Sequence, residues 1–310
     1  MLRPVLREIL ERVGRGDLRL GRLLASPASD SIVVAAGPPG TGPLVAIKVA
    51  HTEAGSKSLA REIDVLRRLS SDPRLRQWRG LLPELLAAGD VRGHVFLVER
   101  FARGLDGRRA VCGPDLRAQA AAAIGALHRA TAARRVVDDA LLERWIDQPL
   151  QLLNGTAGVD RVRSRLYEGF AGRTLSLSWI HGDFVPGNVL VAPDGSGVTG
   201  IVDWDRASAD DLPLLDLLQF TLATRLLVGG RDLGAVVAPL LDGARLDDAE
   251  RALLDRTQEE LPGDPVDLRA AVLLCWLRHV SANLEKSTRY ASSRVWFETN
   301  VAAVLAEVGR

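Results

Sequence analysis

The spacing of hydrophobic positions changes near residue 100 of the chain. Before that point, short runs rich in β-branched residues predict strands, and these runs begin at Leu18, Ser31, Leu44 and His94. One helical pattern, Ser58–Leu69, interrupts them. After Asp115 most apolar residues recur at helical spacing, except in a β-like segment over residues 175–205. The pattern predicts an α+β chain with a small β-rich lobe, residues 1–102, and a large helical lobe, residues 103–310.

The N-terminal segment has apolar residues at helical spacing and charged residues between them. The apolar set is Leu2, Val5, Leu6, Ile9, Leu10 and Val13. We expect an amphipathic helix that packs on the rest of the chain, since an export signal needs an uninterrupted apolar centre and a transit peptide avoids glutamate. The Ala-rich stretch 118–127 is too short to span a bilayer. These features predict a cytoplasmic protein with no membrane partner.

The segment GPPGTG, residues 37–42, has most of a nucleotide-binding loop but lacks its chemical groups. Pro43 and Leu44 stand where a Walker loop needs a lysine for the phosphates and a hydroxyl for Mg²⁺. The segment lies between two β-branched runs, and no helical pattern follows it, whereas a Walker loop opens a helix. The sequence therefore predicts a turn between strands, with any nucleotide held elsewhere.

Composition narrows the class of protein without defining a function. At 310 residues, 47% hydrophobic and 25% charged, the chain is long enough for one large or two ordinary soluble domains. Its 40 basic and 39 acidic residues give a formal net charge of +1, so no overall field favours nucleic acid or an anionic membrane. Cys112 and Cys275 form no CxxC or metal-binding pattern, and we expect buried, reduced thiols.

Two charged residues fall on predicted apolar faces. Lys48 lies between Ile47 and Val49, where a charge needs a partner unless strand alternation leaves it in solvent. Glu62 falls on the apolar stripe of the following helix, three residues after Leu59. An ion pair between Lys48 and Glu62 would account for both positions. The alternative is that both side chains are simply exposed, and these residues alone do not decide between the two interpretations.

The segment WIHGDFVPGNVL, residues 179–190, carries the strongest chemical pattern. Asp183 and Asn188 have the spacing of kinase catalytic loops, where the Asp orients or deprotonates the attacking hydroxyl and the Asn helps to hold Mg²⁺. Asp203 follows the β-like run VTGIV, where a second metal-binding carboxylate is needed. Mg²⁺ favours a few hard oxygen ligands together with phosphate oxygens and water. Asp203, Asn188 and a nucleotide would provide them.

With HGDxxxxN followed by IVDWD, the chain resembles the aminoglycoside phosphotransferase and choline kinase superfamily, a branch of the protein-kinase-like fold. The resemblance covers about residues 48–216. It implies two lobes: a small N-terminal lobe with an antiparallel sheet and one main helix, which binds the nucleotide, and a large, mostly helical C-terminal lobe for catalysis and the acceptor. It also implies ATP or GTP as the donor, Asp183 as catalytic base, and Asn188 and Asp203 as Mg²⁺ ligands.

The resemblance assigns roles to further residues. Lys48, paired with Glu62, would contact the α- and β-phosphates. The run LVERF would connect the lobes, with the backbone of Glu99 and Phe101 meeting the purine edge. Asp216 would brace the catalytic loop without touching substrate.

Four neighbouring residues have structural interpretations instead. We expect His181 to orient the loop from within the core, His128 to be packed or hydrogen-bonded on its helix, and Trp204 to pack. Asp205 is assigned to capping the following turn, with a contact to a second metal as the alternative.

The chain departs from the family pattern in its first β-turn region. No GxGxxG motif lies between the first two strands; the segment there is LLASPASDS, residues 23–31, whose backbone amides and hydroxyls would cover the phosphates. The hydroxyl candidates are Ser26, Ser29 and Ser31. About ten residues separate Asp203 from the next helical run, which is too short for a protein-kinase activation segment and disfavours a protein substrate.

Two classes of function follow from the sequence. The first is a small-molecule kinase that transfers the γ-phosphoryl of ATP or GTP to a hydroxyl of a sugar, nucleoside, antibiotic or related metabolite. The second is a catalytically silent kinase-like protein that binds a nucleotide or metabolite. We expect a neutral or weakly charged acceptor, because the stretch Trp276–Asn300 carries more basic than acidic residues and would repel a polycation. The groups expected to suit hydroxyls and sugar faces are Asn283, Tyr290 and Trp296.

Overall fold

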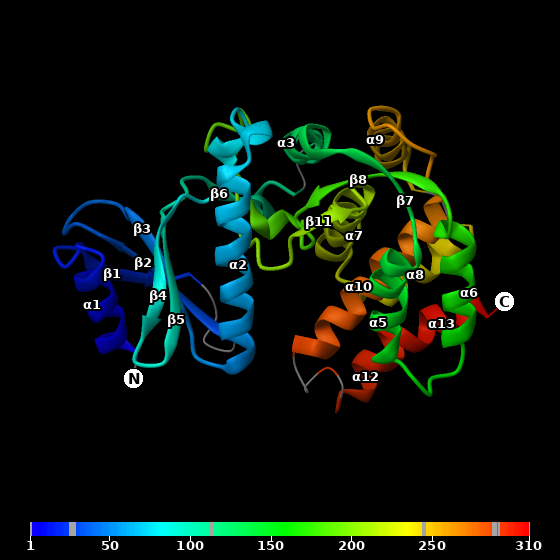
Figure 1. Cartoon of the computed structure of the whole chain (residues 1–310), viewed down its shortest axis with the longest axis horizontal. Coiled ribbons are helices and arrows are strands. Elements are labelled where there is room, and N and C mark those ends of the chain that lie inside the picture. The colour runs from blue at the N-terminus through cyan, green and yellow to red at the C-terminus, as the bar shows by residue number, and fades with distance from the viewer. Residues whose placement is uncertain are drawn as a thin grey trace. The chain divides into compact units, whose positions relative to one another are not determined.

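The structure is a computed structural model that describes residues 2–24, 29–111, 114–243, 246–286, 290 and 292–309 (Figure 1). Two residues singled out from the sequence, Ser26 and Cys112, lie outside the described residues.

The described chain forms two compact units. The first comprises Met1–Asp106 and Asn188–Ala207, and the second comprises Gly107–Gly187 and Ser208–Arg310. The lobe boundary between residues 102 and 103 stays a prediction. The sequence pattern did not assign the later segment, Asn188–Ala207, to the first unit.

A five-stranded antiparallel sheet, in the order β1-β2-β3-β5-β4, forms the frame of the first unit. Its strands are β1 (Arg19–Leu23), β2 (Ser31–Gly37), β3 (Val45–Ala50), β4 (Leu85–Val91) and β5 (His94–Arg100). All but β4 coincide with runs predicted from the sequence; the segment of β4, LLAAGDV, has neither β-branched residues in number nor clear alternation. Helix α1 (Arg3–Arg12) buries its predicted apolar face against the sheet.

The GPPGTG segment connects the antiparallel strands β2 and β3. Ala36 pairs with Val45 across the two strands, and the N–H of Leu44 donates to the carbonyl of Ala36 at 2.8 Å. Gly40 has a φ of 77°, a conformation that glycine adopts without steric cost. The predicted turn is confirmed, because the segment leads into a strand and not into a helix.

Helix α2 (Glu53–Ser71) packs on the same sheet. It begins earlier than the sequence pattern predicts, because Thr52 caps its N-terminus by accepting a hydrogen bond from the N–H of Gly55 at 3.0 Å. Leu59 and Ile63 bury its apolar face against strand residues that include Leu97. Glu62 is buried on this face as well, at 2% exposure. The helix thus brings a carboxylate to the sheet.

A second, small sheet completes the first unit, in the order β10-β9-β6. Its antiparallel strands are β6 (Leu105–Asp106), β9 (Val189–Val191) and β10 (Val198–Ile201). Gly104 fits beside it only without a side chain, since an added Cβ would lie 2.5 Å from Thr199 Oγ1 and the φ is 153°. The sheet places Asn188 immediately before β9 and Asp203 shortly after β10.

The second unit is mostly helical. Its helices are α3 (Pro114–Thr131), α4 (Asp139–Leu142), α5 (Gln148–Gln151), α6 (Val159–Phe170), α7 (Leu214–Gly229), α8 (Leu233–Leu241), α9 (Asp248–Glu259), α10 (Leu268–Lys286), α12 (Arg294–Phe297) and α13 (Ala303–Val308). Its core contains Trp145, Phe170 and Trp276, all fully buried. Cys275 is buried there too, and burial raises the pKa of its thiol to about 12, as expected for an unreactive cysteine.

An antiparallel sheet in the order β11-β8-β7 crosses the second unit. Its strands are β7 (Ala133–Val136), β8 (Thr174–Ile180) and β11 (Ser208–Asp211). The central strand β8 is buried along nearly its whole length and leads directly into the HGD segment. A buried strand therefore anchors the start of the predicted catalytic loop.

The predicted fold class is confirmed: a small unit with an antiparallel sheet and one main helix, and a larger, mostly helical unit. Across the described part of the chain, no helix has the length and apolar character needed to cross a membrane.

Candidate active site

Lys48 and Glu62 form a buried ion pair in the first unit. Lys48 lies on the central strand β3, and its Nζ donates to Glu62 Oε1 at 2.6 Å; the side chains are 6% and 2% exposed. The same Nζ lies 3.2 Å from Asp203 Oδ1. Burial by itself would lower the pKa of Lys48, but the carboxylates of Glu62, Glu99 and Asp203 raise it well above its ordinary value. The ion pair predicted from the sequence is confirmed, and the Lys48 ammonium stays charged.

Glu99 contributes a further buried carboxyl that sequence reasoning missed. Lys48 pairs with Leu97 in the strand register, and alternation places Glu99 on the same face as Leu97. Glu99 is 5% exposed, and among the described residues its Oε2 has no hydrogen-bond partner. Burial raises the pKa of Glu99, and it raises the pKa of Glu62 to about 7 in spite of the attraction of Lys48. The carboxyl groups of Glu62, Glu99 and Asp203 thus surround one cation.

Asn188 and Asp203 lie close together in the first unit. The N–H of Val202 donates to the carbonyl of Asn188 at 2.9 Å, so the two predicted metal ligands flank one backbone hydrogen bond. The side chain of Asp203 is 55% exposed. Its φ of 70° lies in the left-handed region, which turns the chain sharply after β10.

This pair fits Mg²⁺ by its chemistry. A carboxylate and an amide oxygen are the hard donors that Mg²⁺ prefers, and Mg²⁺ usually keeps water and substrate phosphate oxygens in its remaining positions. A site completed by a nucleotide needs few protein ligands. The described residues gather no group of three or more His, Cys, Asp or Glu suited to holding a metal by themselves.

The remaining nucleotide-binding predictions concern backbone and hydroxyl groups of the first unit. Ser29 Oγ donates to the carbonyl of Ser31 at 2.7 Å, which orders the entry into β2. Directly after β5, the N–H of Phe101 donates to the carbonyl of Leu44 at 2.9 Å, so this backbone donor is already engaged. The purine contacts of Glu99 and Phe101 and the phosphate contacts of Ser29 and Ser31 stay predictions.

Asp183 lies in the second unit, in the loop that follows β8. Gly182 precedes it with a φ of 76°, and the N–H of Asp183 donates to His181 Nδ1 at 3.2 Å. Gln219 Nε2 of helix α7 donates to Asp183 Oδ1 at 2.9 Å and so orients the carboxylate. Sequence reasoning missed Gln219, although its place three residues after Asp216 puts both on one face of a helix.

Asp216, at the start of α7, holds this loop in place. Its carboxylate is fully buried and accepts hydrogen bonds from the N–H of His181 at 2.8 Å, the N–H of Gly182 at 2.9 Å and His128 Nε2 at 3.0 Å. Burial by itself would raise the pKa of Asp216, but the hydrogen bonds that its carboxylate accepts, above all the one from His128, lower it below its ordinary value. The bracing role predicted for Asp216 and the hydrogen-bonded role of His128 are confirmed, and His181 is fully buried in the core.

Two residues beside Asp203 have structural roles. Trp204 is fully buried; its ring meets that of Trp78 edge-on with centroids 5.6 Å apart, and its Nε1 donates to the carbonyl of Ile201 at 2.8 Å. The predicted packing role of Trp204 is therefore confirmed. Asp205, which the sequence assigned to capping, accepts a hydrogen bond from Ser58 Oγ of α2 at 2.5 Å.

Comparison with protein families agrees with this arrangement. Residues 22–254 match the family described as phosphotransferase enzymes, and the match spans most of the chain. The protein belongs to this family. No curated protein sequence matches the chain.

Solved structures show the same fold at low sequence identity. A protein from Ralstonia eutropha JMP134 is 16% identical with a TM-score of 0.60, covering 97% of this chain and 96% of that chain. A thermostable mutant of aminoglycoside phosphotransferase APH(4)-Ia, in a ternary complex with ADP and hygromycin B, is 15% identical with a TM-score of 0.56, covering 97% of each chain. Aminoglycoside phosphotransferase APH(3'')-Id from Streptomyces rimosus is 16% identical with a TM-score of 0.55, covering 90% of this chain and 99% of that chain. The predicted protein-kinase-like fold of aminoglycoside phosphotransferases is thereby confirmed.

Proposed function

We propose that this protein is a Mg²⁺-dependent kinase of a small molecule, which transfers the γ-phosphoryl group of ATP or GTP to an acceptor hydroxyl. One observation carries the proposal. The buried Lys48–Glu62 pair lies within reach of Asp203, with Nζ 3.2 Å from its Oδ1, and a fold alone does not require such an arrangement. Each buried carboxylate adds a desolvation cost, and one carboxylate is enough to pair a lysine that has only a structural role.

The groups of the first unit bind the nucleotide in this proposal. Lys48, oriented by Glu62, neutralises the α- and β-phosphates. Asn188 and Asp203 hold Mg²⁺, which when bound neutralises charge on the phosphate oxygens. Ser29 and Ser31 cover the phosphates, and Glu99 and Phe101 meet the purine. Two solved relatives of the same fold contain ADP, which supports a nucleotide as the donor.

Asp183 carries the chemistry at the acceptor. Its carboxylate accepts a hydrogen bond from the attacking hydroxyl of the acceptor and orients that oxygen toward the γ-phosphorus. It takes up the proton as the new P–O bond forms and the bond from the γ-phosphorus to the β,γ-bridging oxygen breaks, which releases the nucleoside diphosphate. Gln219, whose Nε2 lies 2.9 Å from Asp183 Oδ1, orients this carboxylate. Asp216 fixes the backbone that presents Asp183.

The acceptor in this proposal is a neutral or weakly charged hydroxylated molecule, such as a sugar, nucleoside or natural product. Two relatives are described with hygromycin B or streptomycin. In this chain Arg278 is paired with Asp211 and Arg294 with Glu298, each at 2.7 Å, so these residues add little net charge. The rings of Tyr290 and Trp296 lie 5.1 Å apart, and such a pair suits the apolar face of a sugar.

Phosphate transfer onto a panel of acceptors tests the proposal. Purified protein is incubated with γ-labelled ATP or GTP and with sugars, nucleosides, aminoglycosides and other hydroxylated metabolites, with and without Mg²⁺. We expect Mg²⁺-dependent labelling of a neutral acceptor, with a higher kcat/KM than for any aminoglycoside. Nucleotide binding without transfer to any acceptor would instead favour the catalytically silent alternative.

Asp203→Ala tests the metal assignment. It removes the anionic ligand, and we expect the Mg²⁺-dependent part of nucleotide affinity, measured calorimetrically with Mg·ATP, to be lost. Asp194→Ala is the matched control, because Asp194 is an exposed carboxylate between β9 and β10 in the same unit. Unchanged Mg·ATP affinity in Asp203→Ala would contradict the assignment.

A further inference from the structure

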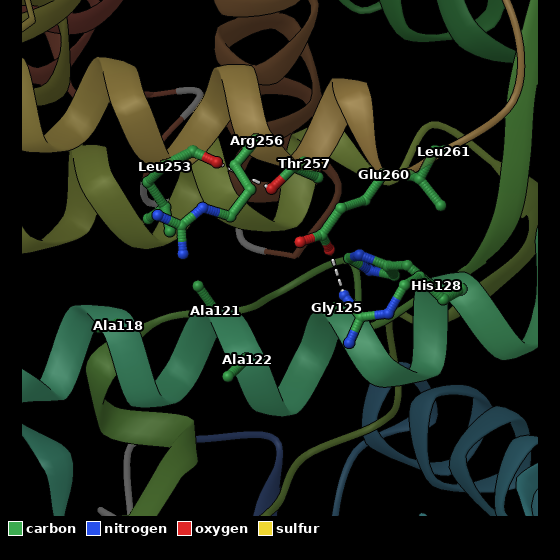
Figure 2. A pocket seen from close by; sticks show the side chains of 11 residues that line it. Ala118, Ala121, Ala122, Gly125, His128, Leu253, Arg256, Thr257, Glu260 and Leu261 are labelled. Atoms are coloured by element: carbon green, nitrogen blue, oxygen red, sulfur yellow. Dashed lines mark hydrogen bonds and ion pairs between the residues drawn. The ribbon is translucent and has the colours of Figure 1, made fainter.

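Helices α3 and α9 of the second unit line a pocket of about 170 Å³, partly open to solvent, that the phosphotransfer proposal does not use (Figure 2). An apolar protein cavity of about 150 Å³ accommodates one benzene molecule. The α3 wall consists of small residues, which leaves a flat apolar surface; they are Ala118, Ala121, Ala122 and Gly125. The space therefore suits a single planar ring with one or two substituents.

His128 lines this cavity and supplies a polar group that lacks a partner. The side chain is 0% exposed, and its Nε2 is 3.0 Å from Asp216 Oδ2. Because the Asp216 carboxylate is an acceptor that already receives two backbone N–H groups, the imidazole proton lies on Nε2. Nδ1 is then a lone-pair acceptor, and in the described part of the chain it has no hydrogen-bond partner. An unpaired buried acceptor favours a ligand that brings a hydroxyl or N–H.

The charged residues at the cavity give it a net positive charge. Arg129 and Glu260 form an ion pair at 2.5 Å and cancel each other. Arg256 of α9 is exposed, and no ion pair of its guanidinium is found within the described residues. Figure 2 shows its side chain extending from α9 toward the alanine face of α3. A guanidinium in this position is suited to a carboxylate.

We propose that the α3–α9 cavity is a binding site for a small aromatic carboxylate that carries a hydrogen-bond donor, with its carboxylate on Arg256 and its donor on His128 Nδ1. This binding site lies outside the residues assigned to phosphotransfer, and the binding proposal does not rest on the proposed function.

A ligand in this site would affect the hydrogen bonds that position the loop containing Asp183. The ligand's donor polarises the His128 imidazole, and His128 Nε2 shares the Asp216 carboxylate with the N–H groups of His181 and Gly182. Asp183 is the next residue along the chain. Ligand binding therefore changes the hydrogen bonds that position the loop, which makes the cavity a candidate effector site.

The test uses 4-hydroxybenzoate as the probe and the full chain without nucleotide, so that its outcome is independent of phosphotransfer. Binding is measured by NMR titration, which also follows the amide signals of His181 and Gly182. We expect saturable binding with a Kd on the order of 1 mM or tighter. Benzoate, which lacks the donor, should bind at least about fivefold more weakly, a loss of about 1 kcal/mol for one hydrogen bond.

Two pairs of variants locate the site. Arg256→Gln should weaken binding about tenfold or more, as expected for a hydrogen bond to a charged group, while Arg251→Gln on the same helix should leave the Kd unchanged. Ala122→Leu fills the cavity and should abolish binding, while Ala252→Leu, an exposed substitution that does not line the cavity, should not. Ala122 and Arg256 are both exposed, so the fold is expected to tolerate these changes.

Absence of saturable binding overturns the proposal, and so does binding that persists in Arg256→Gln and Ala122→Leu. Equal affinities for benzoate and 4-hydroxybenzoate would overturn the role of His128. Binding that leaves the amide signals of His181 and Gly182 unshifted would overturn the link to the catalytic loop. Saturable binding that follows the variant pattern and shifts both amides supports it.

Discussion

The two units each contain a buried polar cluster, and the two clusters are built in opposite ways. In the second unit, one carboxylate, that of Asp216, receives three hydrogen-bond donors. In the first unit, one cation, that of Lys48, lies among the carboxylates of Glu62, Glu99 and Asp203, and Glu99 Oε2 has no partner in the described chain. The Asp216 carboxylate has a donor on each of its oxygens, whereas in the Lys48 cluster three carboxyl groups share one cation.

This difference separates a structural cluster from one prepared for a ligand. A satisfied buried network rigidifies the backbone around it, which is what a catalytic loop requires. Carboxyl groups crowded around one cation are costly to bury, and under the proposed function a bound metal ion would offset part of that cost. The predictions below test each side of this contrast.

The largest expected effect is on catalysis. Asp183→Asn keeps the shape of the side chain but removes its ability to take a proton, so phosphate transfer should fall by about 10²–10⁴ in kcat while nucleotide affinity stays nearly unchanged. Steady-state transfer rates and calorimetry measure the two quantities. Asp210→Asn, at an exposed aspartate of the same unit, is the control. Near-wild-type turnover in Asp183→Asn would show that Asp183 is not the catalytic base.

Removing the satisfied cluster should cost folding stability. Asp216→Ala leaves two backbone N–H groups and His128 without their buried acceptor, and the free energy of unfolding should fall by about 3–5 kcal/mol. Urea unfolding of this variant is compared with that of Asp255→Ala, where an exposed aspartate of α9 is removed and a change within about 0.5 kcal/mol is expected. Similar stabilities for the two variants would refute the bracing role.

The Lys48–Glu62 pair should show strong coupling in a double-mutant cycle. Lys48→Ala and Glu62→Ala each break the same buried pair, so their effects on unfolding should be non-additive by about 1–3 kcal/mol. The matched control is the Glu53–Lys57 pair on the same helix α2, 2.7 Å apart but 84% and 71% exposed, where about 0.3–0.5 kcal/mol is expected. Additive losses at Lys48 and Glu62 would mean that the pair contributes no specific energy.

The last prediction concerns the pH dependence of stability. Burial raises the pKa of Glu62 to about 7 and raises that of Glu99, so the folded chain holds protons that the unfolded chain releases near pH 4.5. Stability should therefore fall as pH rises from about 4.5 to 7. The lowered pKa of Asp216 acts in the opposite sense, with stability lost only as pH falls below its ordinary value near 3.8.

Glu99→Gln should flatten this slope, because one carboxyl of the crowded cluster is removed. Urea unfolding between pH 5 and 8 measures it, and Glu84→Gln, at an exposed carboxylate next to β4, serves as the control. A slope unchanged in Glu99→Gln would indicate that Glu99 does not share the proton of the cluster.

Patterns with a local physical cause could be predicted from the sequence. The apolar face of α1, the GPPGTG turn and the four β-branched strands follow from spacing and from glycine and proline, and β4 was missed because its segment lacks that signal. The Lys48–Glu62 pair could be anticipated because a charge on an apolar stripe needs a partner.

Features that depend on strand register or on contacts between distant segments could not be predicted from local sequence patterns. The burial of Glu99 follows from the pairing of Lys48 with Leu97, which the sequence does not state. The contact of Asp205 with Ser58 joins residues far apart in the chain, so a local capping interpretation was preferred. The α3–α9 cavity likewise arises only when two helices pack.

The left-handed backbone of Asp203 has an evolutionary consequence. Glycine adopts a positive φ without steric cost, whereas an L-residue there costs on the order of 1 kcal/mol. A Gly at this position would suit the chain conformation better and would relieve the crowding of carboxylates, at the loss of the ion pair with Lys48. Under the proposed function, drift toward a folded but inactive descendant is one codon change away, and selection for what the carboxylate does opposes it.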